Sequence, residues 1–194
     1  MRHDGPKLLF AGLAKEAFRD VEVEPKLQPL TGESFELKTT NIQDDARSDV
    51  RIRSFWRKVR NAFFDFKVSY PFASTYRNQS IESMYKTMEK TKKREYQRRI
   101  FEIEDGDFTP MIMTSTGGMG REMSIAIGHL ARTLADKKNN NYSDVIRLIR
   151  CQFNFAIIRS SLICLRGSRS ISKHSMQQCP HLNVESAMFD IGLV

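Results

Sequence analysis

Two segments in which apolar and polar residues strictly alternate constrain the fold of this chain most. They span residues 49–53 and, after the adjacent Phe63, residues 64–68; a period of two is the pattern of a β-strand that buries one face. The apolar members would share that buried face: Val50, Ile52, Phe64, Phe66 and Val68. The chain is therefore expected to fold around a sheet that carries charged residues on its opposite face.

Helices and further strands are predicted around these two segments. Apolar residues at helical spacing predict helices over residues 7–18, 80–99, 121–138 and 143–166, the last with Ser143 as its N-cap. Further strands are expected over residues 20–25, 100–104 and 108–116, with a short one around residues 35–37. The sequence Glu104-Asp-Gly-Asp107 is typical of a hairpin turn between two of these strands.

This order of elements predicts an α/β or α+β fold with a central mixed sheet of about five strands flanked by helices. The 194 residues suffice for one domain over residues 1–167, followed by a loosely ordered tail over residues 168–194. Three arginines interrupt the most apolar stretch, residues 145–165, so we expect no membrane span. Three cysteines without CxxC spacing favour a reducing intracellular setting, nuclear or cytoplasmic.

The positive charge of the chain is concentrated in one segment. The formal net charge is +8, and residues 46–100 alone carry 15 Lys or Arg against 5 Asp or Glu. A polarised basic surface favours a polyanionic partner, which makes DNA or RNA the first candidate. The alternative is an ordinary solvated helix face.

Two acids and one amine lie in the alternating segments of this basic region. If the two strands are neighbours, Asp49, Asp65 and Lys67 converge on one face of the sheet. Adjacent carboxylates repel unless a cation lies between them, and oxygen ligands select hard ions such as Mg²⁺ or Mn²⁺. A lysine beside such an ion could hold the attacking water and offset charge on phosphorus. The alternative is that Asp65 and Lys67 are the solvent-facing half of an edge strand.

Six short segments of the sequence carry a resemblance to a known class of proteins. They are Asp20-Val-Glu-Val-Glu-Pro-Lys-Leu-Gln-Pro-Leu30, Asp45-Ala-Arg-Ser-Asp-Val50, Asn61-Ala-Phe-Phe-Asp-Phe-Lys-Val68, Glu102-Ile-Glu-Asp-Gly-Asp-Phe-Thr-Pro110, Gly117-Gly-Met-Gly120 and Leu165-Arg-Gly-Ser-Arg169. In order of elements and in the Asp and Asp-x-Lys positions, the chain resembles the PD-(D/E)xK restriction-endonuclease-like nucleases. Within them it is similar to uncharacterised, retroelement-associated proteins of animals.

The resemblance implies a restriction-endonuclease-like core and a Mg²⁺- or Mn²⁺-dependent nuclease that cuts DNA, of mobile-element origin. It makes Asp49 and Asp65 the metal ligands and Lys67 the catalytic lysine. Ser48 stands where the superfamily carries proline, and Gly5 stands where many relatives carry a glutamate on the first helix. The alternative is therefore a nucleic-acid-binding module of the same fold whose catalytic site has decayed.

Basic residues near this site are the candidate nucleic-acid contacts. Arg51 and Arg53 follow Asp49 on the same strand, with Phe55 and Trp56 close behind. The helix predicted from Ser80 adds a second group: Lys86, Lys90, Lys93 and Arg94. The alternatives are aromatic rings that pack under a loop and a surface helix held together by its own ion pairs.

Other motifs point less clearly to a function. Gly117-Gly-Met-Gly120 could present backbone N–H groups to a phosphate, although a tight strand-to-helix turn is the simpler interpretation. The spacing of His174, Cys179 and His181 fits no standard zinc finger. Cys151 and Cys164 are expected in the core, within the apolar last helix. Oligomeric state is left open.

Overall fold

The computed structural model describes residues 3–28 and 47–166 of the chain. In these residues the elements are α1 (Asp4–Ala17), β1 (Val21–Val23), β2 (Val50–Arg53), β3 (Asn61–Ser69), a 3₁₀ turn (Ser74–Tyr76), α2 (Ile81–Glu102), β4 (Asp107–Thr114), α3 (Arg121–Lys138) and α4 (Tyr142–Arg166). The predicted strand at residues 35–37 and the predicted tail, with its histidines and Cys179, lie outside the described residues.

One mixed sheet forms the centre of the fold. Its strand order is β1-β2-β3-β4, with antiparallel pairing between β1 and β2 and between β2 and β3, and parallel pairing between β3 and β4. The parallel pair requires a crossover, which α2 provides. The mixed α/β class is confirmed, with four strands in the described part of the chain where we expected about five.

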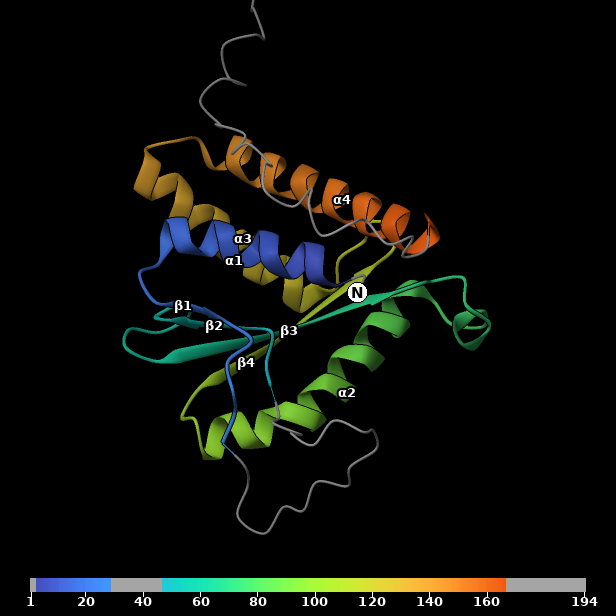
Figure 1. The fold of residues 1–194 in the computed structure, drawn as a ribbon, viewed down its shortest axis with the longest axis horizontal. Helices are drawn as coiled ribbons and strands as arrows, with labels where there is room; N and C mark the ends of the chain where they lie inside the picture. Colours follow the sequence, from blue (N-terminus) through green and yellow to red (C-terminus); the bar gives the residue numbers. More distant parts are fainter. Residues whose placement is uncertain (1–2, 29–46, 167–194) are drawn as a thin grey trace, which may run out of the picture.

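Helices cover both faces of the sheet. Figure 1 shows α1, α3 and α4 on one side and α2 on the other. The larger core lies under α1, α3 and α4, where Phe64 and Phe66 of β3 pack with Phe10 of α1 and Phe153 of α4. Phe63, on the other face of β3, packs with Ile100 of α2. Strand β3 is thus buried on both faces, as is usual for a strand with a parallel neighbour.

The strand predicted at residues 100–104 is wrong, because α2 continues to Glu102. Ile100 is fully buried in the cluster with Phe63, so the helix gains apolar burial by continuing past the expected end. The chain then turns at Asp105, which has a φ of 42°, and the Gly106 N–H donates to the Ile100 carbonyl. Residues 104–107 therefore connect a helix to a strand and do not form the expected hairpin.

Two smaller predictions about α4 are also corrected. Asn141 caps this helix in place of Ser143, since its side-chain oxygen accepts a hydrogen bond from the Ser143 N–H at 2.8 Å. Cys151 is exposed on the outside of α4 and is not part of the core. The N-cap predicted for α2 is confirmed, because the Ser80 hydroxyl accepts a hydrogen bond from the Ser83 N–H.

No helix of the described part of the chain is both long and apolar enough to span a membrane.

Candidate functional site

The pairing of β2 with β3 sets the positions of the two predicted ligands. Val50 lies opposite Phe64, and the Asp49 N–H donates to the Phe64 carbonyl at 3.1 Å. Asp49 therefore lies opposite Asp65 on the next strand. Because Val50, Phe64 and Phe66 fill the larger core, strand alternation turns Asp49 and Asp65 to the face that α2 covers. Burial is the main cause of the raised pKa of Asp65, and the negative charge of Asp49 adds to it.

Each oxygen of Asp49 has a defined neighbour. The Phe66 N–H donates to Oδ2 at 2.6 Å, so the side chain bridges β2 to β3 where backbone pairing ends. Oδ1 lies 4.0 Å from the Lys7 ammonium of α1. The side chain is 15% exposed, which leaves it accessible to a small ligand.

Asp65 is the more deeply buried acid. Its Oδ2 lies 2.8 Å from the Lys92 ammonium of α2, and within the described residues this enclosed oxygen has no well-aligned hydrogen bond. Burial raises the pKa of Asp65, and the positive charge of Lys92 only partly opposes that rise. The carboxylate therefore depends on a nearby cation for its charged form.

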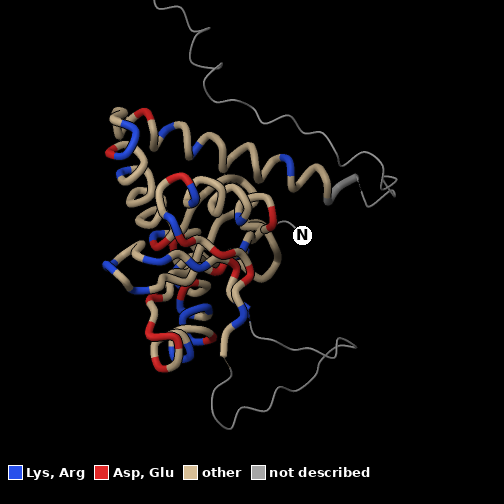
Figure 2. The backbone as a smooth tube through the Cα atoms, turned by 60° about the vertical axis from the view of Figure 1, so that its left-hand side comes forward, with Lys and Arg blue, Asp and Glu red and all other residues tan. Residues whose placement is uncertain are grey.

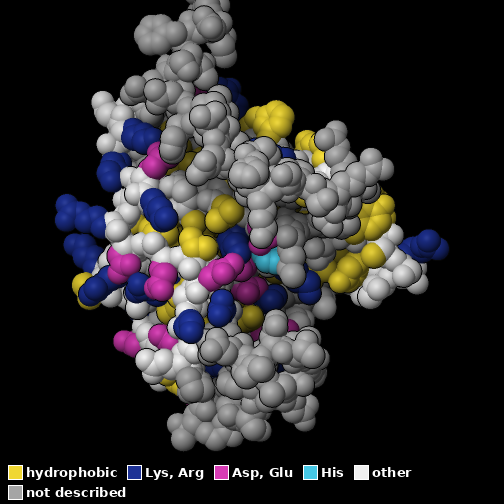
Figure 3. All heavy atoms as spheres, in the orientation of Figure 1, with side chains coloured by type: hydrophobic (Ala, Val, Ile, Leu, Met, Phe, Trp, Pro, Cys, Tyr) yellow, Lys and Arg dark blue, Asp and Glu magenta, His cyan; other side chains and the backbone are white. Residues whose placement is uncertain are grey.

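Lys7 is a buried lysine among three carboxylates. Its ammonium lies 2.7 Å from Glu24 Oε1, 3.3 Å from Asp4 Oδ1 and 4.0 Å from Asp49 Oδ1. Burial on its own would lower the pKa of Lys7, but these acids outweigh burial and the net pKa is raised. Lys7 thus fixes the start of α1 against the site (Figure 3 shows acidic and basic side chains lying together across this side of the molecule).

Lys67 lies where the alternation places it. It is half-buried on β3, two residues after Asp65 and on the same strand face. Within the described residues, the Lys67 ammonium makes no hydrogen bond or ion pair. It is therefore available to an incoming anion, whereas Lys7 and Lys92 already hold carboxylates.

The predicted nucleic-acid contacts fall into two groups. Arg51, Lys86 and Lys93 form ion pairs with Glu22 at 2.9 Å, Glu82 at 2.8 Å and Glu122 at 2.7 Å, respectively. Three others are exposed and, among the described residues, have no charged partner: Arg53, Lys90 and Arg94. Arg94 also lines a shallow hollow of α2 with Lys93, Arg98 and the exposed ring of Phe101. The unpaired group is the part of the basic surface best able to contact phosphates.

The glycine-rich segment is a strand-to-helix turn. The Gly117 N–H donates to the Thr114 carbonyl, and Gly117 has a φ of 90°, a conformation that suits glycine. The start of α3 already binds an anion of the protein itself, because the Glu122 N–H donates to the buried Glu89 carboxylate at 3.1 Å. The phosphate-binding interpretation of this segment is therefore not favoured.

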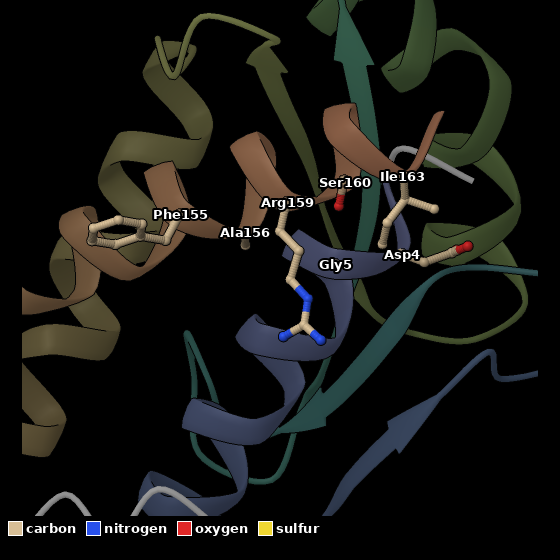
Figure 4. Close-up of a pocket in the computed structure, with 7 residues that line it drawn as sticks. All are labelled: Asp4, Gly5, Phe155, Ala156, Arg159, Ser160 and Ile163. Carbon is tan, nitrogen blue, oxygen red and sulfur yellow. The ribbon is translucent and has the colours of Figure 1, made fainter. Parts of the chain in front are cut away.

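Gly5, which stands where the resemblance implies a glutamate, packs against α4. A Cβ on Gly5 would lie 2.5 Å from the Ser160 hydroxyl and 3.3 Å from the Ala156 carbonyl, so this residue is pressed against α4 (Figure 4). A glutamate there would collide with α4 unless Ser160 or α1 moved. Asp4 and Lys7 are the residues through which α1 contacts the site.

Sequence reasoning missed two residues of this site, Lys7 and Lys92. Lys7 shares one face of α1 with the buried Ala11 and Ala14, at the helical spacing of four and seven residues. A lysine at a position of the apolar face of a helix was the sequence signal that Lys7 is buried. Lys92 is one of seven basic residues on α2, and its sequence position alone did not distinguish it from the others.

The acidic side chains of the site are oxygen donors, the kind of ligand that a hard divalent ion needs. No group of three or more His, Cys, Asp or Glu side chains that could hold a metal occurs in residues 3–28 and 47–166. Mg²⁺, however, is commonly bound through one or two carboxylates plus water and substrate phosphate. Asp49 and Asp65 supply two carboxylates, and among the described residues the enclosed Oδ2 of Asp65 has only the Lys92 ammonium as its polar contact.

Comparison with known proteins assigns no family and no function to this site. The chain matches no protein-family profile and no curated protein.

Lys7→Met is expected to lower the free energy of unfolding by about 1–2 kcal/mol, because three acids would lose their shared ammonium. Solvent screening of the half-exposed Glu24 keeps the effect small. Lys15→Met, an exposed position on the same helix, is the matched control in urea unfolding. Equal stabilities of the two variants would contradict a structural role for Lys7.

The pH dependence of this effect follows from the raised pKa of Lys7. The stabilisation by Lys7 is fully present below the pKa of a lysine in the unfolded chain and is lost as pH rises through the higher folded-state value. The difference between wild type and Lys7→Met should therefore shrink in strongly alkaline solution. A difference that grows there would contradict the assignment.

Proposed function

We propose that this protein is a divalent-metal-dependent nuclease that hydrolyses DNA phosphodiester bonds, of the restriction-endonuclease-like class and of mobile-element origin. The observation that carries the proposal is the pairing of Asp49 with Asp65 on adjacent strands, with Lys67 on the same face. The order helix, three strands, helix over α1 to α2 supports it, since this is the order that the resemblance implies.

Asp49 and Asp65 would hold Mg²⁺ or Mn²⁺, which when bound would polarise a phosphoryl oxygen and lower the pKa of a water molecule. The chain's own groups have separate tasks. The Phe66 N–H fixes Asp49, and the Lys92 ammonium opposes protonation of Asp65 inside the fold. Lys67 supplies an unpaired ammonium to orient the attacking water and offset charge on the phosphate.

The exposed cations would position the substrate. Lys90 and Arg94 lie on the outer surface of α2, whose other side carries Lys92 to Asp65. Arg53 is exposed at the end of β2, the strand that Asp49 precedes. Contacts of this kind go to phosphates and set the register of a nucleic acid without reading its sequence.

A plasmid-nicking assay tests the proposal. Supercoiled DNA incubated with the protein and Mg²⁺ or Mn²⁺ should be converted to nicked circles, and an excess of chelator should stop the conversion. Conversion that continues in chelator would contradict the metal-dependent mechanism. Absence of conversion with either ion would contradict the nuclease proposal itself.

The ion pairs of Lys7 and Lys92 favour a second function, the binding of nucleic acid without catalysis. Lys7 and Lys92 already neutralise the two acids, an arrangement that needs no metal and suits a nucleic-acid-binding module without catalysis. That module would bind DNA without cutting it. Affinity would be unchanged by chelator and would fall steeply between low and moderate salt, because bound phosphates release counterions.

The salt slope can be assigned to particular residues. Removing Lys90 or Arg94 should each reduce the slope of log affinity against log salt by roughly one, as expected for the loss of one phosphate contact. Lys138→Met is the control, since Lys138 lies on α3 and is paired with Glu16. A salt slope unchanged in both α2 variants would contradict a DNA-contacting role for this surface.

A further inference from the structure

Helix α4 is apolar on two opposite sides. Its inner side carries Ile149, Phe153 and Ile157, which are at most 2% exposed and belong to the larger core. Its outer side nevertheless carries further large apolar residues, with their exposed fractions in parentheses: Leu148 (44%), Phe155 (67%), Ile158 (54%) and Leu162 (47%). A helix that is apolar all round is normally buried, so the outer side lacks a partner among the described residues.

The outer apolar residues follow a regular spacing. With the exposed Cys151, they occur at intervals of three, four, three and four residues: Leu148, Cys151, Phe155, Ile158 and Leu162. This is the heptad pattern with which one helix packs along another, and it forms a single stripe on α4. We call these five residues the outer stripe. At about 1.5 Å per residue it is about 21 Å long, enough for roughly four turns of a second helix.

The borders of the outer stripe are basic. Residues 145–163 contain Arg147, Arg150 and Arg159 and no aspartate or glutamate. Figure 2 shows α4 as a long tube, mostly without charge, with a few basic positions. The acid just before this stretch in the sequence, Asp144, is already bound to Arg147 at 3.0 Å. Residues 145–163 of a second copy of α4 would therefore bring further arginines and no carboxylates to this surface.

A recess near the C-terminal half of α4 adds a second feature. It lies between α4 and the start of α1 and is lined by Phe155, Arg159 and Ile163 together with Asp4 and Gly5. Figure 4 shows Arg159 extending from α4 toward α1 along this recess. A recess that combines apolar side chains with an arginine and an aspartate is the kind of place where a partner's anchoring side chain contributes most to affinity.

We propose that the outer stripe of α4 is a docking surface for an acidic amphipathic α-helix of a partner protein. Apolar residues of that helix would pack on the stripe, and its flanking Glu or Asp residues would face Arg150 and Arg159. The surface lies on the other side of the sheet from α2, so it does not depend on the proposed nuclease activity (Figure 1).

A designed peptide of about 21 residues, with Leu and Ile at the heptad core positions and Glu beside them, is the probe. Fluorescence anisotropy with the full chain should give saturable binding. Phe155→Asp should weaken it at least about tenfold and Arg150→Glu about fivefold. Ile125→Asp, which alters an exposed apolar residue of α3, should leave binding unchanged.

Four outcomes would overturn the proposal. The full chain could fail to bind the acidic peptide, or it could bind a lysine-flanked version of that peptide equally well. Sedimentation could show a dimer of the chain that Phe155→Asp dissociates, which would identify a second copy as the occupant. Vesicles containing phosphatidylserine could bind through Phe155 while the peptide does not, which would assign the surface to a membrane.

Discussion

Asp65→Asn is expected to reduce Mg²⁺-dependent DNA cleavage on the order of a thousandfold. A metal-bound carboxylate contributes several kcal/mol to transition-state stabilisation, and each 1.4 kcal/mol corresponds to a factor of ten in rate. The substitution keeps the shape of the side chain but removes the charge that a divalent ion needs. Initial rates of plasmid nicking at equal protein concentration provide the measurement.

A matched control separates loss of chemistry from loss of fold. Asp136→Asn neutralises an exposed acid of α3 and should cleave at the wild-type rate. Both variants should give cooperative urea unfolding curves. Asp65→Asn cleaving as fast as Asp136→Asn would remove Asp65 from the catalytic site.

Lys92→Met is expected to destabilise the fold by about 3 kcal/mol, because it leaves the buried Asp65 carboxylate without its counter-charge. The methionine side chain preserves most of the apolar packing of the lysine stem, so the loss reports mainly on charge. Urea unfolding measures it. Lys90→Met, two residues earlier and exposed, is the control and should change stability by less than about 0.5 kcal/mol.

The double variant Asp65→Asn/Lys92→Met provides the decisive comparison for this ion pair. Removing both charges leaves no uncompensated group, so most of the stability lost in Lys92→Met should return. The same pair predicts a pH effect. Since burial raises the pKa of Asp65, the defect of Lys92→Met should shrink as acid protonates that carboxylate. A double variant as unstable as Lys92→Met would contradict the account.

The strands could be predicted from the sequence where only one face of the strand is buried, because apolar and polar residues then alternate. Val50 and Ile52 in β2 and Phe64 and Phe66 in β3 all lie in the predicted core, because strand geometry fixes a period of two. Strand β3 was harder, since Phe63 is also buried, under α2. The face of β3 under α2 carries both a core residue, Phe63, and a site residue, Asp65. Alternation of apolar and polar residues does not distinguish the two.

The C-terminal end of α2 could not be predicted from the residues around it. Residues 100–104 contain two isoleucines, Ile100 and Ile103, which favour a strand by propensity. Burial of Ile100 against Phe63 and the turn at Gly106 keep Ile100 helical, and both depend on contacts across the fold. Tertiary packing thus outweighed a weak local preference.

The candidate site was predictable only in part. Asp49, Asp65 and Lys67 follow from alternation along two neighbouring strands. That Lys92 contacts Asp65 depends on where α2 crosses β3, and that Lys7 contacts Asp49 depends on how α1 meets the start of β2. These are contacts between residues at least 27 positions apart in the sequence, which no local pattern specifies.

Binding of Mn²⁺ followed by electron paramagnetic resonance tests most directly whether Asp49 and Asp65 form one cation site. Wild type should bind one ion per chain in a saturable manner. Asp49→Asn and Asp65→Asn should each abolish saturation, whereas Asp136→Asn should not. Saturable binding that both site variants retain, or wild-type protein that leaves all Mn²⁺ free, would contradict the account.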